Sequence, residues 1–177
     1  MNCMTKVQEE RFYYLETVSA LKQFLLEKKR RLIKRLEKKE HSEETKKAQK
    51  YLSLLEAVLT SSYFFEEFKY QKVYQLMQRL KEDDRLLKKE IEDLKKKLGD
   101  MELYLATTDE FSIPEDYAIS DERKDLEDVL NAKRKEYERK ITLIREEMRE
   151  KQINLSICRN LKGMICRPHG FFDAVLH

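Results

Sequence analysis

Glycine, proline and tryptophan are scarce in this chain of 177 residues, which holds 3 Gly, 2 Pro and no Trp. Tight turns consume glycine and proline, whereas helix interiors exclude both. A compact fold with many turns is therefore disfavoured. We predict an all-α protein of elongated shape, made of helices joined by few connections.

Cysteines and long apolar runs are also few. The three cysteines form no even set for disulfide pairing, and a Lys-rich chain of this kind suits a reducing compartment. No stretch approaches 18 consecutive apolar residues, and MNCMTKVQEERFYYLE lacks the apolar core of a secretory signal. We expect no transmembrane segment and a cytoplasmic, cytoskeletal location, with the nucleus as the alternative.

The motifs of common enzyme chemistries are missing as well. The chain has no glycine-rich phosphate loop, no G-x-S-x-G, no H-E-x-x-H and no C-x-x-C. Acid–base chemistry would depend on carboxylates, and these are expected on solvated helix faces, where nothing prepares them for proton transfer near neutral pH. We predict no enzymatic activity and no cofactor.

One group of residues near the C-terminus has the composition of a tetrahedral zinc site. It consists of Cys158, Cys166, His169 and His177. The spacing C-x7-C-x2-H-x7-H matches no compact zinc finger, and Cys158 falls on a predicted helix. A nucleophile pair of Cys166 and His169 lacks an orienting third group. We therefore predict reduced thiols and no metal, with zinc at these four residues as the alternative.

Charge and apolar periodicity are abundant, since 40% of the residues are charged and 41% are hydrophobic. Ten positions alternate in steps of four and three, and nine of them are apolar, as in the seam of a coiled coil. They are Val73, Met77, Leu80, Asp84, Leu87, Ile91, Leu94, Leu98, Met101 and Leu105. Asp84 is the exception, and it is expected either at a hydrated point of the seam or as the residue that fixes the register.

A second, weaker stripe has the same spacing. It consists of Leu130, Arg134, Tyr137, Ile141, Ile144, Met148, Lys151 and Leu155. Between the stripes, Pro114 cannot continue a helix, and Ser120 followed by two acids is a favourable helix start. We predict a long antiparallel coiled-coil hairpin, roughly 66–106 against 121–160, within a segment of residues 66–160.

Residues 1–65 are predicted to form a small bundle of amphipathic helices. Its apolar stripes are Leu15, Val18, Leu21, Leu25, Leu32 and Leu36, then Tyr51, Leu52, Leu55, Val58 and Leu59. Ser42 is a candidate N-cap between them, although one continuous helix stays possible because Gly and Pro are missing there. Five aromatic residues within positions 63–70 are predicted to join this bundle to the hairpin.

Residues 161–177 are predicted to be an irregular apolar tail. Gly163 and Gly170 are expected to stop the helix, and Pro168 fixes an extended step. The apolar side chains of this tail, among them Met164, Ile165, Phe171 and Phe172, need cover. We expect a partner protein to supply it, with packing on the N-terminal bundle as the alternative.

The segment KKRRLIKRLEKK holds eight basic residues and one acid. The bases are Lys28, Lys29, Arg30, Arg31, Lys34, Arg35, Lys38 and Lys39. Such a positive field suits a nucleic-acid backbone, a nuclear import signal, an anionic membrane or a calmodulin-type partner. A solvated helix face partly neutralised by acids explains it without any ligand, and none of the functional interpretations is specific.

The loop 107–120 lies in a stretch without any Lys or Arg between residues 100 and 122. Its acids alternate with aromatic residues, a pattern that suits docking of a basic protein surface. The predicted docking residues are Asp109, Glu110, Phe111, Glu115, Asp116 and Tyr117, together with Phe171 and Phe172 of the tail. Acids are also common at helix ends and in loops without any partner.

These surfaces favour a non-enzymatic coiled-coil scaffold or adaptor that mediates protein–protein interaction, with other proteins or with further copies of itself. Cytoskeletal, ciliary and kinetochore assemblies use such parts. One alternative is a nuclear or nucleic-acid-binding helical module acting through residues 28–39. Another is a stalk or adaptor that regulates an ATPase or a secretion apparatus.

Overall fold

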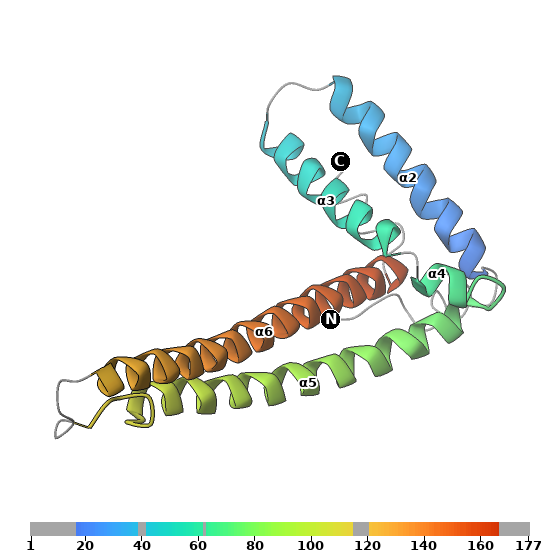
Figure 1. Ribbon diagram of the computed structural model, residues 1–177. Helices are drawn as coiled ribbons and strands as arrows, with labels where there is room; N and C mark the ends of the chain where they lie inside the picture. Colours follow the sequence, from blue (N-terminus) through green and yellow to red (C-terminus); the bar gives the residue numbers. More distant parts are fainter. Residues whose placement is uncertain (1–16, 39–41, 62, 115–120, 167–177) are drawn as a thin grey trace. The chain divides into compact units, whose positions relative to one another are not determined.

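The computed structural model describes residues 17–38, 42–61, 63–114 and 121–166, and this part of the chain is helical (Figure 1). The helices are α2 Val18–Lys38, α3 Glu43–Thr60, α4 Tyr63–Glu67, α5 Val73–Thr107 and α6 Asp121–Cys166. An isolated bridge joins Thr17 to Lys72, and the described residues contain no strand. The protein is therefore all-α, as its composition predicts.

The chain divides into two compact units, and α5 and α6 each contribute to both. Unit 1 comprises Met1–Leu86 and Asn154–His177, and unit 2 is Leu87–Ile153. The boundaries expected from the sequence, at residues 65 and 160, both lie within unit 1. Unit 2 is thus a helical insertion between two chain segments that build unit 1 together.

Helices α2 and α3 of unit 1 are separate. Ser42 has extended backbone angles, φ −129° and ψ 170°, and its side chain accepts a hydrogen bond of 3.4 Å from the Thr45 amide. Glu43 and Glu44 follow in the first turn, where carboxylates favour the positive end of the helix dipole. The predicted N-cap is confirmed, and the alternative of one continuous helix is wrong.

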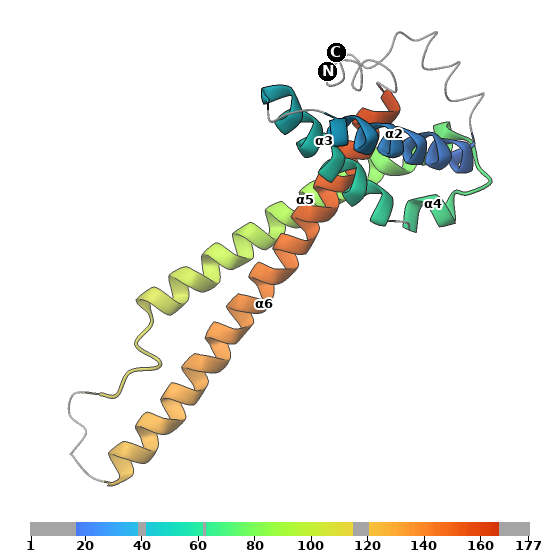
Figure 2. The same cartoon turned by 90° about the horizontal axis from the view of Figure 1, so that it is seen from above.

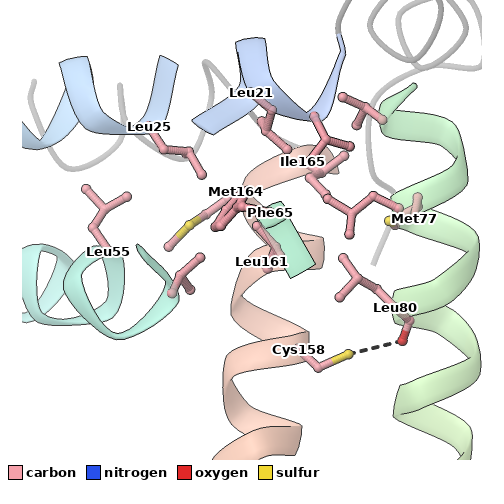
Figure 3. Close-up of a cluster of buried hydrophobic side chains, with 14 of the residues drawn as sticks. Leu21, Leu25, Leu55, Phe65, Met77, Leu80, Cys158, Leu161, Met164 and Ile165 are labelled. Carbon is pink, nitrogen blue, oxygen red and sulfur yellow. Dashed lines mark hydrogen bonds between the residues drawn. The ribbon is translucent and has the colours of Figure 1, made fainter. Parts of the chain in front are cut away.

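The core of unit 1 brings together side chains from α2, α3, α4, α5 and α6 (Figure 3). It contains Val18, Leu21, Leu25, Leu32, Ala48, Tyr51, Leu55, Val58, Phe65, Val73, Leu76, Met77, Leu80, Cys158, Leu161, Met164 and Ile165. Each large apolar side chain buried here contributes on the order of 1.5–3 kcal/mol. The apolar stripes predicted within α2 and α3 are the faces that enter this core.

The aromatic run at residues 63–70 divides between core and surface. Phe65 is buried in the core, and Phe64 and Phe68 pack against it, but Tyr70 is 86% exposed. The next helix begins at Val73, not at residue 66 as expected. The segment between α4 and α5 accepts two hydrogen bonds from the start of α2. Val18 N donates to Gln71 O at 2.9 Å, and Ser19 N donates to Lys69 O at 3.1 Å.

Helix α6 continues to Cys166, so the expected end near residue 160 is wrong. Gly163 lies inside the helix, and a Cβ there would meet no atom within 4 Å. Glycine in a helix costs only about 1 kcal/mol, whereas Leu161, Met164 and Ile165 are each at most 2% exposed. Burial in the core of unit 1 outweighs the local penalty and extends the helix.

This finding also corrects the expected cover of the tail. Met164 and Ile165 are buried against side chains of the same chain, so for these two residues the expectation of a covering partner is wrong. The remaining tail residues, including Phe171 and Phe172, lie outside the described residues.

Within unit 2, α5 and α6 lie side by side in both views (Figure 1, Figure 2). Tyr137 Oη donates to Met101 O at 3.3 Å, and Lys151 Nζ lies 2.9 Å from Glu90 Oε2. As α6 advances along the chain, its partners on α5 therefore move backwards, which makes the pair antiparallel. Ile91, Ile141 and Ile144 of the predicted stripes are buried between the helices.

Candidate interaction surfaces

Asp84 is the polar member of the apolar α5 stripe, and the structure places it inside unit 1 beside two bases. Lys162 Nζ lies 2.7 Å from Asp84 Oδ2, and Arg159 Nε lies 3.5 Å from the same oxygen. The side chain of Asp84 is only 18% exposed. Two roles were predicted for Asp84, a hydrated point of the seam or the residue that fixes the register. The two ion pairs fit the second role better.

The ionised form of Asp84 is stabilised by these neighbours. Burial by itself disfavours the carboxylate, but hydrogen bonds and positive charge from Lys162 and Arg159 outweigh it, so the pKa of Asp84 is lowered. The Asp84 carboxylate of α5 thus pairs with one position along α6, the turn that carries Arg159 and Lys162. The result is a specific contact between α5 and α6.

Cys158 lies one helical turn before Lys162 on α6. Its Sγ is 3.0 Å from the backbone oxygen of Leu80 (Figure 3), and burial raises the pKa of the thiol to about 11. A protonated, buried thiol that donates to a carbonyl is a poor nucleophile and a poor metal ligand. Both features favour the predicted reduced thiol at this position.

The predicted zinc set has three further members besides Cys158. The Cys166 side chain, His169 and His177 are outside the described residues. Among the residues that are described, no three His, Cys, Asp or Glu side chains gather as a metal ion requires.

The end of unit 2 near the inter-helix loop is organised by aromatic contacts. The ring of Tyr137 lies 5.3 Å from that of Tyr104 and 6.0 Å from that of Phe111, centroid to centroid. Tilted pairs at such distances are favourable beyond their burial. Ser112 N also donates to Asp109 O at 3.0 Å, which closes a turn just before this loop leaves the described region.

A groove of about 590 Å³ lies beside these rings, between the loop and α6. Its apolar lining residues are Phe111, Val129, Ala132 and Tyr137, and its charged lining residues are Glu110, Lys133, Glu136 and Lys140. The lining carries both signs of charge. It therefore selects neither a strongly acidic nor a strongly basic ligand.

The predicted acidic docking site is only partly described. Asp109 and Glu110 are exposed, as docking requires, but Phe111 is half-buried and contacts Tyr137. Glu115, Asp116 and Tyr117 lie outside the described residues. Glu102, from the same acidic stretch, is paired with Arg145 of α6. Part of this stretch therefore holds unit 2 together.

The predicted basic residues of α2 differ in their surroundings. Lys29 lies 3.9 Å from Glu56 of α3, Arg31 lies 3.3 Å from Glu27, and Lys28 Nζ lies 5.4 Å from the ring centroid of Phe24. Arg30, Arg31, Lys34, Arg35 and Lys38 are exposed, and Lys39 lies outside the described residues. The exposed bases thus form a face of α2 that turns away from the core.

Two features of these surfaces were not predicted. Lys46, Lys47 and Lys50 of α3 are exposed and belong to the same helix pair as the basic face of α2. Large apolar side chains are also exposed on unit 2, where Leu103, Val129, Leu143 and Ile153 are each 50–64% exposed. The seam residues dominate the apolar periodicity of each helix, so sparse apolar residues on its other faces give no comparable signal.

Comparison with known proteins identifies no relative. The sequence matches no protein-family model and no curated protein, and the fold matches no solved structure. Along the described chain, no helix combines the length and hydropathy needed to cross a bilayer. The class of this protein is therefore defined by its own architecture, an all-α chain in which two long helices pack together.

Proposed function

We propose that the protein is a non-enzymatic coiled-coil scaffold or adaptor that holds other proteins, or further copies of itself, in a larger cytoplasmic assembly. The observation that carries the proposal is the row of exposed apolar side chains along α6 in unit 2. Val129, Leu143 and Ile153 are 50%, 54% and 55% exposed. Single exposed apolar side chains are common on protein surfaces, so the support comes from the position of these three on one side of the helix.

The spacing of these residues supports a helical partner. Val129 and Leu143 are two heptads apart, so they occupy the same column of a coiled coil. Ile153 follows Leu143 by one heptad plus three residues, which is the step between the two columns of a seam. Since Ile141 and Ile144 of the same helix already face α5, this second row is available to a third helix.

The antiparallel coiled coil itself is part of the proposal. The least exposed positions of α5 in unit 2 are Leu87, Ile91, Leu94, Leu98, Met101 and Leu105, which repeat in steps of four and three. This alternation, with Ile141 and Ile144 opposite, supports side chains that interlock along the pair. Assemblies of the cytoskeletal, ciliary or kinetochore type use rigid helix pairs of this kind.

The test changes Val129, Leu143 and Ile153 together to Ser in the full chain. Because all three side chains are largely exposed, we expect the unfolding free energy to change by only about 1 kcal/mol or less. Oligomeric state is measured by sedimentation, and partners are compared by proximity labelling in the protein's own cells. Loss of self-association, or of a reproducible set of partners, is expected.

A matched control changes three exposed charged residues in another heptad column of the same helix, Asp128, Lys135 and Arg149, to Ser. It removes side-chain volume from nearby positions without touching the apolar row. An apolar variant that keeps the same oligomeric state and the same partners as the control would refute the proposal.

A further inference from the structure

A local excess of positive charge lies on the paired helices α2 and α3. Residues 27–38 and 42–50 hold ten Lys and Arg against four acids. Arg30, Arg31, Lys34 and Lys38 are exposed on α2, and Lys46, Lys47 and Lys50 are exposed on α3. We call these seven side chains the two-helix basic surface.

Acidic neighbours neutralise this surface only in part. Glu27 reaches Arg30 at 3.9 Å and Arg31 at 3.3 Å, and Glu43 reaches Lys46 at 3.9 Å. Ion pairs between such exposed side chains contribute little and are screened by salt. No carboxylate of the described chain lies within 4.0 Å of Lys34, Lys47 or Lys50, so their charge is available to a ligand.

The two-helix basic surface offers positive charge to a ligand but no large exposed apolar side chain. None of the large exposed apolar side chains in the described chain belongs to α2 or α3, because their apolar faces are buried in the core of unit 1. Stable protein interfaces have an apolar or aromatic centre, and a helix that lies on a membrane needs a free apolar face. Neither is present on this surface.

A phosphate backbone matches the remaining chemistry. Single-stranded nucleic acid is bound largely by stacking on aromatic rings, but Tyr51 of α3 is only 3% exposed and Phe24 of α2 packs against the core of unit 1. Along α2, Arg31, Lys34 and Lys38 follow one another by one turn each and span about 10 Å. Successive phosphates of one duplex strand advance by about 3.4 Å along its axis, so this row covers about three of them.

We propose that the two-helix basic surface binds the phosphate backbone of double-stranded nucleic acid without reading its sequence. Lys34 and Lys38 would lie along one strand, while the lysines of α3 add charge beside it. This activity is separate from the apolar row of unit 2. Duplex DNA and duplex RNA share the backbone chemistry, so the experiment includes both.

The experiment measures binding of the full chain to fluorescent 20-base-pair DNA and RNA duplexes by anisotropy, between 50 and 200 mM salt. The variant changes Lys34, Lys47 and Lys50 to Gln. Each lost phosphate contact lowers the slope of log K against log salt by about one, so we expect the slope to fall by about 2–3 and the affinity at 50 mM salt to drop at least about tenfold.

The control variant makes the same charge change in unit 2, at the exposed residues Lys95, Lys96 and Lys97. Its binding and salt slope are expected to stay close to those of the unchanged protein. Far-ultraviolet circular dichroism checks the fold of both variants. Should the triple variant lose helix content, the single change Lys47→Gln provides the same test, with an expected slope change of about one.

Three results would overturn the proposal. The first is failure of the unchanged protein to bind either duplex at 50 mM salt. The second is an equal loss of binding in the control variant, which would mean that net charge and not this surface is responsible. The third is binding to phosphatidylserine vesicles that depends on Lys34, Lys47 and Lys50 while duplex binding does not, which would assign the surface to a membrane.

Discussion

Replacing Ile165 by Ala tests whether the last turns of α6 belong to the core of unit 1. Ile165 is 0% exposed and packs with Leu161 and Met164 among side chains of α2 and α5 (Figure 3). Truncation of a fully buried Ile costs about 2–5 kcal/mol, because the transfer free energy of the removed atoms is lost and a cavity remains. Taking 3 kcal/mol, the melting temperature should fall by about 6–12 °C for a chain of this size.

The assay is urea and thermal unfolding of the full chain, followed by circular dichroism at 222 nm. Leu86→Ala is the matched control, since Leu86 belongs to the same unit and its side chain is 40% exposed. We expect the control to cost about 1 kcal/mol or less. If Ile165→Ala costs no more than Leu86→Ala, these turns of α6 do not pack as described and the reasoning fails.

Three further predictions concern other parts of the molecule. Folding lowers the pKa of Asp84, so its ion pairs contribute fully above about pH 4 and are lost as the pH falls through the lowered value. The change Asp84→Asn should therefore cost about 1–2 kcal/mol of unfolding free energy at pH 7 and much less at pH 2. An equal cost in urea unfolding at both pH values would contradict this. Spin labels at Lys96 and Glu146 should lie about 20–30 Å apart in an antiparallel pair, whereas a continuous helical rod would separate them by about 75 Å in electron-spin distance measurements. Phe111→Ala should lower unfolding free energy by about 1–2 kcal/mol because it removes the contact with Tyr137, while Glu110→Ser should leave calorimetric melting unchanged, and similar effects of both would contradict the structural role of Phe111.

Local patterns predict the helices and their buried faces well. Val18, Leu21 and Leu25 follow helical spacing, and all three are buried. The cap at Ser42 is equally local, because a side-chain oxygen reaches an amide three residues further along. Features that depend on a few neighbouring residues can be predicted from sequence because no distant contact competes with them.

Several features that depend on distant contacts could not be predicted. The sequence around Gly163 indicates a helix end, and only the core of unit 1 reveals why the helix continues. Asp84 pairs with Lys162 and Arg159, which lie far along the chain and come near it only when α5 and α6 pack together. In the same way, composition indicates the basic face of α2, but Lys47 and Lys50 come near α2 only because α3 folds back against it.

The interrupted construction of unit 1 has a consequence for its synthesis on the ribosome. The core residues Leu161, Met164 and Ile165 are translated only after the whole of unit 2, so the faces of α2 and α3 must wait for their cover. Roughly 80 residues separate the end of the first segment from Cys166, which corresponds to about 4–16 s at ordinary translation rates. During that interval the nascent chain presents Leu21, Leu25 and Leu55 incompletely covered, and its dependence on chaperones should rise with the length of the inserted helices.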